Sequence, residues 1–173
     1  MVEENITVTF RLKKFIMDSL KNEAECNYET LNSVVTRIFR QHNEWHKIAP
    51  KIGQTYFSKS IIQQFLENFD NKTIATIAND YVTKELKGQI WLSGKNFDGR
   101  SFLNFMELWI KNSGFQFEHK DEGDICTLSI HHNMGEKFSF FLYEIFKVAF
   151  SELKLNVEKL DKTDKVVTLK AHV

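Results

Sequence analysis

The stretch ITVTFRL, residues 6–12, decides how the N-terminal part of this chain can fold. Apolar and polar side chains alternate along it without interruption. The apolar set is Ile6, Val8, Phe10 and Leu12, and the polar set is Thr7, Thr9 and Arg11. Successive side chains of a β-strand point to opposite faces, so this alternation predicts a strand with one face to bury and one polar face.

Two amphipathic helices are predicted directly after this strand. In residues 13–26, Ile16, Leu20 and Ala24 recur every four residues, which is the spacing of one helix face. Asn27 is expected to end this helix, because asparagine tolerates the left-handed conformation of a C-terminal cap. Thr30 then offers an N-cap hydroxyl to a second helix that ends near residue 45.

A lone strand with two helices cannot complete a fold by itself. No obvious partner strand follows within the next hundred residues, so the backbone groups of residues 6–12 would stay unpaired. Fewer than fifty residues also bury too little apolar surface to be stable alone. Pairing with the same strand of a second chain solves both problems. Residues 1–47 are therefore predicted to form a β-α-α module that works as an intertwined homodimer.

The outward face of such a two-stranded ribbon has the chemistry to read double-stranded DNA. An antiparallel ribbon fits the major groove, where arginine pairs with guanine and threonine contacts bases or a thymine methyl group. Backbone N–H groups at the start of the second helix suit phosphate. The expected base contacts are Thr7, Thr9 and Arg11, and the expected phosphate contacts are Lys13, Lys14, Thr30, Leu31 and Asn32.

The segment TVTFRLKKFIMDSLKNEAECNYETLNSVVTRIFRQHNEW, residues 7–45, resembles the ribbon-helix-helix superfamily of Arc-type and MetJ-type repressors. The resemblance implies a dimer, base readout by the three outward strand residues and phosphate contact at the start of the second helix. Two positions depart from the family pattern. Lys13-Lys14 replaces the proline often found before the first helix, and Asn27 replaces a common glycine.

Residues 48–173 are predicted to form an α+β domain, with helices followed by a β-β-α-β-β run and a mainly antiparallel sheet. The helices are expected at 59–69, 72–86 and 101–112. A hairpin is expected from strands at 115–120 and 125–132, with Glu122-Gly123 as its turn and His119 opposite Cys126. A helix at 136–153 and strands at 155–160 and 165–171 complete the chain.

The segment HHNMGEKFSFFLYEIFKVAF, residues 131–150, is similar to one found after ribbon-helix-helix modules in a group of archaeal regulators. In that group a strand ending in histidine leads through a glycine turn into an aromatic-rich helix. The resemblance implies that the C-terminal domain senses an effector or assembles dimers into a tetramer.

Aromatic residues are abundant, with 16 phenylalanines and three tryptophans. They suit an aromatic core with a dimer interface, or a pocket for a small apolar effector. The candidate pocket residues are His119, Cys126, His132, Phe138 and Phe141. The thiol and imidazoles among them could instead hold a metal or sense oxidants, although buried residues of this kind are more often ordinary core members.

Several function classes have no support in the sequence. The motifs GxGxxG, GxxxxGK[ST], GxSxG and HExxH are absent, so no enzyme, cofactor or metal site is predicted. No apolar run is long enough for a membrane helix, and two distant cysteines indicate reduced thiols in the cytoplasm. A DNA-binding transcription regulator is the resulting prediction. The alternative is a dimerising interaction protein that regulates a protein partner.

Overall fold

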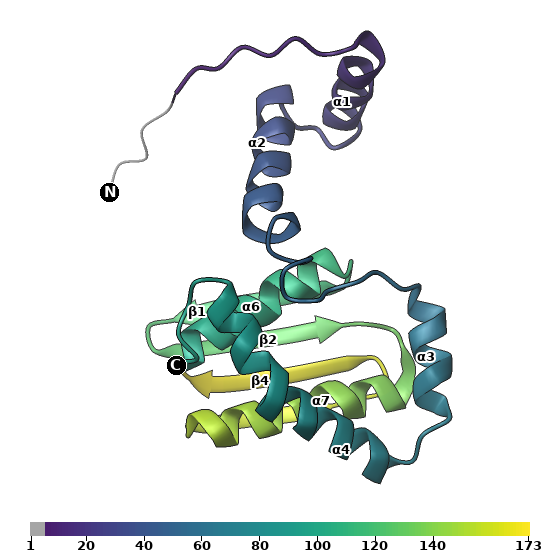
Figure 1. Cartoon of the computed structure of the whole chain (residues 1–173), viewed down its shortest axis with the longest axis vertical. Coiled ribbons are helices and arrows are strands. Elements are labelled where there is room, and N and C mark those ends of the chain that lie inside the picture. The colour runs from purple at the N-terminus through teal and green to yellow at the C-terminus, as the bar shows by residue number, and fades with distance from the viewer. Residues whose placement is uncertain (1–5) are drawn as a thin grey trace. The chain divides into compact units, whose positions relative to one another are not determined.

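A computed structural model describes residues 6–173 of the chain (Figure 1). The chain divides into two compact units, Met1–His46 and Lys47–Val173. The domains expected from the sequence, 1–47 and 48–173, differ from this division by one residue.

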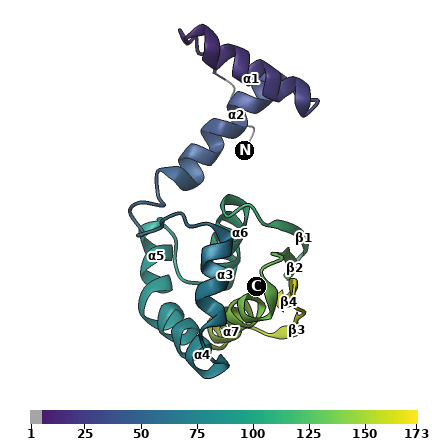
Figure 2. The same ribbon diagram turned by 90° about the vertical axis from the view of Figure 1, so that its right-hand side faces the viewer.

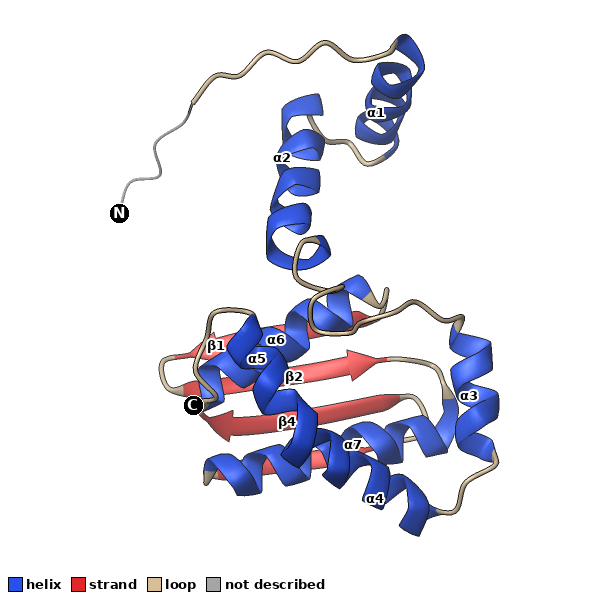
Figure 3. Ribbon diagram, in the orientation of Figure 1, coloured by secondary structure: helices blue, strands red, loops and turns tan. Residues whose placement is uncertain are grey.

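The N-terminal unit contains two helices, α1 (Lys14–Cys26) and α2 (Leu31–Gln41), and α2 continues into a π-helical turn, His42–His46 (Figure 3). The predicted cap of α2 is confirmed, because the Thr30 side chain accepts a hydrogen bond of 3.1 Å from the Ser33 N–H. This bond satisfies one of the N–H groups that the first turn of a helix leaves without an intrahelical acceptor.

The left-handed residue that ends α1 is Tyr28, with φ of 55°, and the expectation for Asn27 is wrong. Asn27 keeps a φ of −97° and is the C-cap residue of α1. The Glu29 N–H donates to the Ala24 carbonyl at 2.9 Å and the Tyr28 N–H to the Glu25 carbonyl at 3.2 Å. These two hydrogen bonds form a Schellman motif, in which the left-handed residue directly follows the C-cap, and that residue is Tyr28.

Residues 6–13 form no strand within the single chain, so the expected N-terminal ribbon is not seen. A strand needs a second backbone beside it, and no other described residues of this chain pair with the segment. Its apolar side chains are exposed, at 81% for Ile6, 63% for Val8, 57% for Phe10 and 43% for Leu12. One chain alone supplies neither the ribbon partner nor the cover for these side chains.

The C-terminal unit is built on a four-stranded antiparallel sheet in the order β1-β2-β4-β3. Its strands are β1 (Gln116–Glu122), β2 (Ile125–His131), β3 (Val157–Lys162) and β4 (Val166–His172). Helix α7 (Gly135–Leu153) joins β2 to β3, which confirms the α+β class and the β-β-α-β-β order. Figure 2 shows the helices of this unit on one side of the sheet.

Helices α6 (Gly99–Asn112) and α7 lie against the sheet, α6 near β1 and α7 near β3 and β4. Outside them lie α3 (Lys59–Glu67), α4 (Asn71–Asp80), a π-helical segment (Tyr81–Leu86) and α5 (Lys87–Leu92). The core between these layers includes Phe102, Leu128, Leu142, Phe146 and Leu169, all fully buried. This unit therefore completes its own hydrophobic core.

The register of the β1–β2 hairpin differs by two residues from the expected one. His119 lies opposite Leu128 and Asp121 lies opposite Cys126. The turn residues are thus Gly123 and Asp124, with Gly123 at a φ of 65°. The first central position of a type II′ turn requires positive φ, so glycine is favoured there and the turn moves forward by one residue. A shift of two residues in the register leaves every side chain on its predicted face.

Candidate functional sites

The N-terminal unit buries very little of its apolar surface. Among its described residues, the buried apolar ones are Ala24, Val34 and Trp45. Large apolar side chains on both helices remain exposed, namely Phe15, Ile16, Ile38 and Phe39. The Phe10 ring lies 5.6 Å from the Phe39 ring, so the segment 6–12 is in contact with α2. Exposed apolar surface of this kind is common where two proteins meet.

The residues predicted to contact DNA are accessible. Thr7, Thr9 and Arg11 are exposed, as are Lys13 and Lys14 where α1 begins. Nothing in the described part of the chain covers the polar side of residues 6–12.

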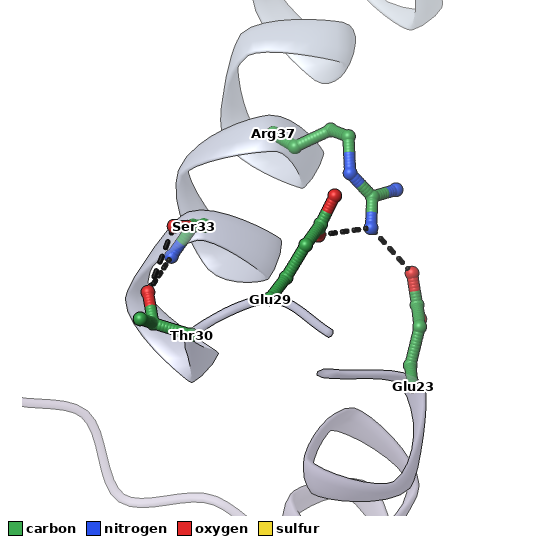
Figure 4. Close-up of polar contacts among 5 residues, drawn as sticks. All are labelled: Glu23, Glu29, Thr30, Ser33 and Arg37. Carbon is green, nitrogen blue, oxygen red and sulfur yellow. Dashed lines mark hydrogen bonds and ion pairs between the residues drawn. The ribbon is translucent and has the colours of Figure 1, made fainter. Parts of the chain in front are cut away.

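Three of the predicted phosphate contacts, Thr30, Leu31 and Asn32, lie at the start of α2, and Figure 4 shows Thr30 there. Thr30 and Asn32 are exposed and Leu31 is half-buried. Thr30 Oγ1 also lies 2.8 Å from Ser33 Oγ, so a hydrogen bond between the two side chains stabilises the turn as well. The N–H groups of Leu31 and Asn32 belong to the first helical turn, where α-helical geometry provides no acceptor. The turn therefore presents backbone donors to an anion, together with the positive end of the helix dipole.

Arg37 organises the carboxylates around this turn. Its Nη2 donates to Glu23 Oε1 at 2.8 Å and to Glu29 Oε2 at 3.2 Å (Figure 4). The hydrogen bonds to Glu23 and Glu29 raise the pKa of the Arg37 guanidinium. The contacts connect α1, the turn and α2, and they compensate the Glu29 charge beside Thr30. The sequence analysis did not identify Arg37. The available signal was the spacing of Glu29 and Arg37, which is about two helical turns and places opposite charges near one another.

A cavity of about 320 Å³ opens in the C-terminal unit and is mainly aromatic. Its lining includes Tyr56, Phe57, Lys59, Trp109, Phe115, Phe138 and Phe141. Phe138 and Phe141 are candidate pocket residues from the sequence. Trp109 and Phe141 also border a second hollow of about 190 Å³. The Lys59 ammonium lies 4.3 Å from the centre of the Phe115 ring, which adds a cation–π contact to the wall.

His132 lies behind this cavity and has a structural role. Its ring centre is 5.0 Å from that of Phe138. Nδ1 accepts a hydrogen bond of 3.0 Å from the Met134 N–H, and Nε2 lies 2.8 Å from Ser139 Oγ. Burial lowers the pKa of His132 to about 4, so the ring is neutral at pH 7 and bridges the turn to α7.

His119 and Cys126 form a separate cluster on the β1–β2 hairpin. His119 Nε2 lies 3.3 Å from Cys126 Sγ. Cys126 is buried, and burial raises the pKa of its thiol to about 11. Cys126 and His132 are six residues apart along one strand direction, a span of roughly 20 Å. The structure therefore divides the five candidate pocket residues between two places.

Comparison of the chain with protein-family models, curated proteins and solved structures finds no significant match. Among the described residues, no helix has both the length and the apolar character needed to cross a membrane.

Proposed function

We propose that this protein is a dimeric, sequence-specific DNA-binding transcription regulator of the ribbon-helix-helix type. The observation that carries the proposal is the exposed apolar row of residues 6–12 on a two-helix unit that buries few apolar residues. A second copy would pair with this row as an antiparallel strand. Pairing would satisfy the backbone N–H and C=O groups of both strands. The two rows would also cover the exposed apolar side chains of four helices and so complete a shared core.

In this dimer the polar sides of the two strands face away from the helices. Thr7, Thr9 and Arg11 of each chain would enter the major groove, where Arg11 can pair with guanine O6 and N7. The Thr30 turn of each chain would receive a phosphate, since its backbone donors are accessible. Lys13 and Lys14 would add charge contacts at the groove edge.

The C-terminal unit would serve effector sensing or assembly of dimers into a tetramer. The aromatic cavity around Phe138 and Phe141 suits a small apolar effector by its lining and by its size. An effector would change DNA affinity only if it bound two arrangements of the dimer with different affinities. We propose that such a regulator acts in the cytoplasm.

Replacing Arg11 by alanine tests the proposal. With DNA sequences selected from a random pool, Arg11→Ala should weaken binding by about 1–3 kcal/mol and relax the preference at one base position. Arg40→Ala, a change of an exposed arginine at the end of α2, serves as the matched control and should bind normally. Sedimentation should show that both variants remain dimers. Equal DNA affinity of Arg11→Ala and the wild type would exclude the ribbon as the reader.

A second candidate function is regulation of a protein partner by the same dimer. It is favoured by the near balance of basic and acidic side chains in the N-terminal unit, which weakens nonspecific attraction to DNA. A stable dimer that enriches no sequence from random DNA would support this second candidate.

A further inference from the structure

We propose that the β1–β2 hairpin binds one divalent transition-metal ion of the zinc class through His119, Asp121 and Cys126. His119 and Asp121 are two residues apart on β1 and share one face, and Asp121 lies directly opposite Cys126 on β2. The three side chains thus converge because of the strand register. Their ligand atoms all lie within 4.8 Å of one another.

Two of the three separations between these atoms fit tetrahedral coordination, and the third, between Asp121 and Cys126, is no more than 4.8 Å. His119 Nε2 lies 3.3 Å from Cys126 Sγ and 3.2 Å from Asp121 Oδ1. Zinc bonds of roughly 2.0–2.3 Å at tetrahedral angles place ligand atoms about 3.3–3.6 Å apart. An ion can therefore enter between the three atoms with only small movements of the side chains.

The surrounding side chains orient two of the ligands. Glu107 Oε2 on α6 lies 2.7 Å from His119 Nδ1, so a proton on Nδ1 leaves the Nε2 lone pair for the metal. A histidine that binds zinc commonly donates its other ring N–H to a carboxylate in this way. Arg100 Nη1 lies 3.0 Å from Asp121 Oδ2, which leaves Oδ1 for coordination.

The donor set also determines the class of ion and its charge balance. A thiolate with an imidazole favours zinc, cobalt or similar ions over magnesium and calcium. On binding, the S–H bond of Cys126 breaks, a sulfur–metal bond forms, and the proton leaves to solvent. The charges of the thiolate and Asp121 then balance the dication, and those of Arg100 and Glu107 balance each other. Three protein ligands leave a fourth position for water or a further ligand.

Asp121 is exposed, so the ion has a path from solvent although Cys126 is buried. The site lies within the C-terminal unit and does not depend on the proposed DNA-binding function.

The test uses full-length protein without a histidine tag, kept reduced and titrated with Co²⁺ and then Zn²⁺. We expect one equivalent of Co²⁺ to give sulfur-to-cobalt charge-transfer absorption, which Zn²⁺ displaces. Cys126→Ser should abolish this absorption. Asp121→Asn and His119→Gln should weaken affinity at least tenfold, and Glu107→Gln about 10–100-fold.

Two matched controls report on the other candidate ligands. Cys26→Ser changes the exposed cysteine of the N-terminal unit, and His131→Gln changes a side chain on the opposite face of β2. Both should bind Co²⁺ as the wild type does. Circular dichroism checks the fold of each variant. Since Asp121 is exposed, Asp121→Asn tests the site even if Cys126→Ser misfolds.

Three results would overturn the proposal. The first is the absence of charge-transfer absorption from folded, reduced protein. The second is absorption that disappears in Cys26→Ser but persists in Cys126→Ser. The third is wild-type affinity in folded Asp121→Asn. If the first result is accompanied by oxidation of Cys126 by peroxide, the cluster belongs to redox chemistry instead.

Discussion

The two units of this protein differ in how completely each one buries its own apolar residues. In the C-terminal unit, a sheet and two helices enclose fully buried aromatic and aliphatic side chains, among them Phe102, Phe146 and Leu169. In the N-terminal unit, both helices and residues 6–12 leave large apolar side chains exposed. The C-terminal unit completes its own core, whereas the proposed function treats the N-terminal unit as half of a dimeric structure, which we call the half-structure interpretation. Apolar surface that one chain cannot cover is therefore the main guide to function.

The largest expected effect lies in the core of the C-terminal unit. Phe102 is fully buried, with its ring centre 5.8 Å from that of Phe146 and 5.9 Å from that of Phe150. Phe102→Ala should lower the free energy of unfolding by about 3–5 kcal/mol, because it leaves a large cavity. Urea unfolding should show this loss at every protein concentration. The exposed Phe65 is the control, and Phe65→Ala should cost less than about 0.5 kcal/mol.

A change in residues 6–12 should act on association instead. Val8→Asp places a charge in the predicted dimer core and should cost about 2 kcal/mol for each chain, or about 4 kcal/mol for the pair. Analytical ultracentrifugation should show monomers at concentrations where the wild type is dimeric. Thr9→Asp on the polar side should keep the dimer and weaken only DNA binding. A Val8→Asp protein that dimerises normally would remove the basis for the half-structure interpretation.

The pH dependence of the C-terminal unit should come partly from His132. Its pKa is about 4 in the folded protein and 6.5 in the unfolded chain, so between these values the unfolded state binds more protons. Stability is therefore lost as the pH falls from 6.5 to 4, by at most about 3 kcal/mol.

His132→Asn should remove that dependence, as measured by urea unfolding at pH 7 and at pH 4.5. Its amide oxygen can still accept the Met134 N–H. His42→Gln, which changes an exposed histidine of the N-terminal unit, should retain the wild-type pH profile of the C-terminal unit. An unchanged slope in His132→Asn would refute the assignment to this ring.

The smallest expected effect is at the turn between α1 and α2. Tyr28 has positive φ and is 99% exposed, so Tyr28→Gly relieves backbone strain and loses no packing. Glycine also raises the conformational entropy of the unfolded chain, which offsets part of this gain. We expect a net gain of about 0.5–1 kcal/mol in the stability of the N-terminal unit. Asn27→Gly should instead destabilise it, since Asn27 has negative φ. Thermal unfolding of both variants distinguishes Tyr28 from Asn27 as the left-handed position.

The sequence was a good guide where a local signal determines structure. The alternation in residues 125–131 and the aromatic stripe of residues 136–153 predicted a strand and a helix that the structure confirms. The hairpin register was predicted less well, because the run Asp-Glu-Gly-Asp allows two turn positions. Only the requirement of Gly123 for positive φ selects between them. The structure of one chain leaves the predicted strand at residues 6–12 without a partner to pair with.

The candidate sites show the same distinction between local and long-range signals. Cys126 and His119 were expected together from the hairpin and do lie in contact. Their separation from Phe138 depends on where α7 crosses the sheet, which no local pattern specifies. Glu107 on helix α6 contacts His119 on strand β1, and no local pattern in either element indicates this pairing.

The strand order β1-β2-β4-β3 has a consequence for folding kinetics. The two central strands are joined across α7, and Ser129 meets Thr168 from 39 residues away in the chain. Each outer hairpin can form by closing a short loop, whereas the central pairing must wait until α7 has docked. We expect this late step to set the refolding rate of the C-terminal unit at every dilution. In the proposed dimer, refolding of the N-terminal unit should instead slow as the protein is diluted, because the ribbon would form only when two molecules meet.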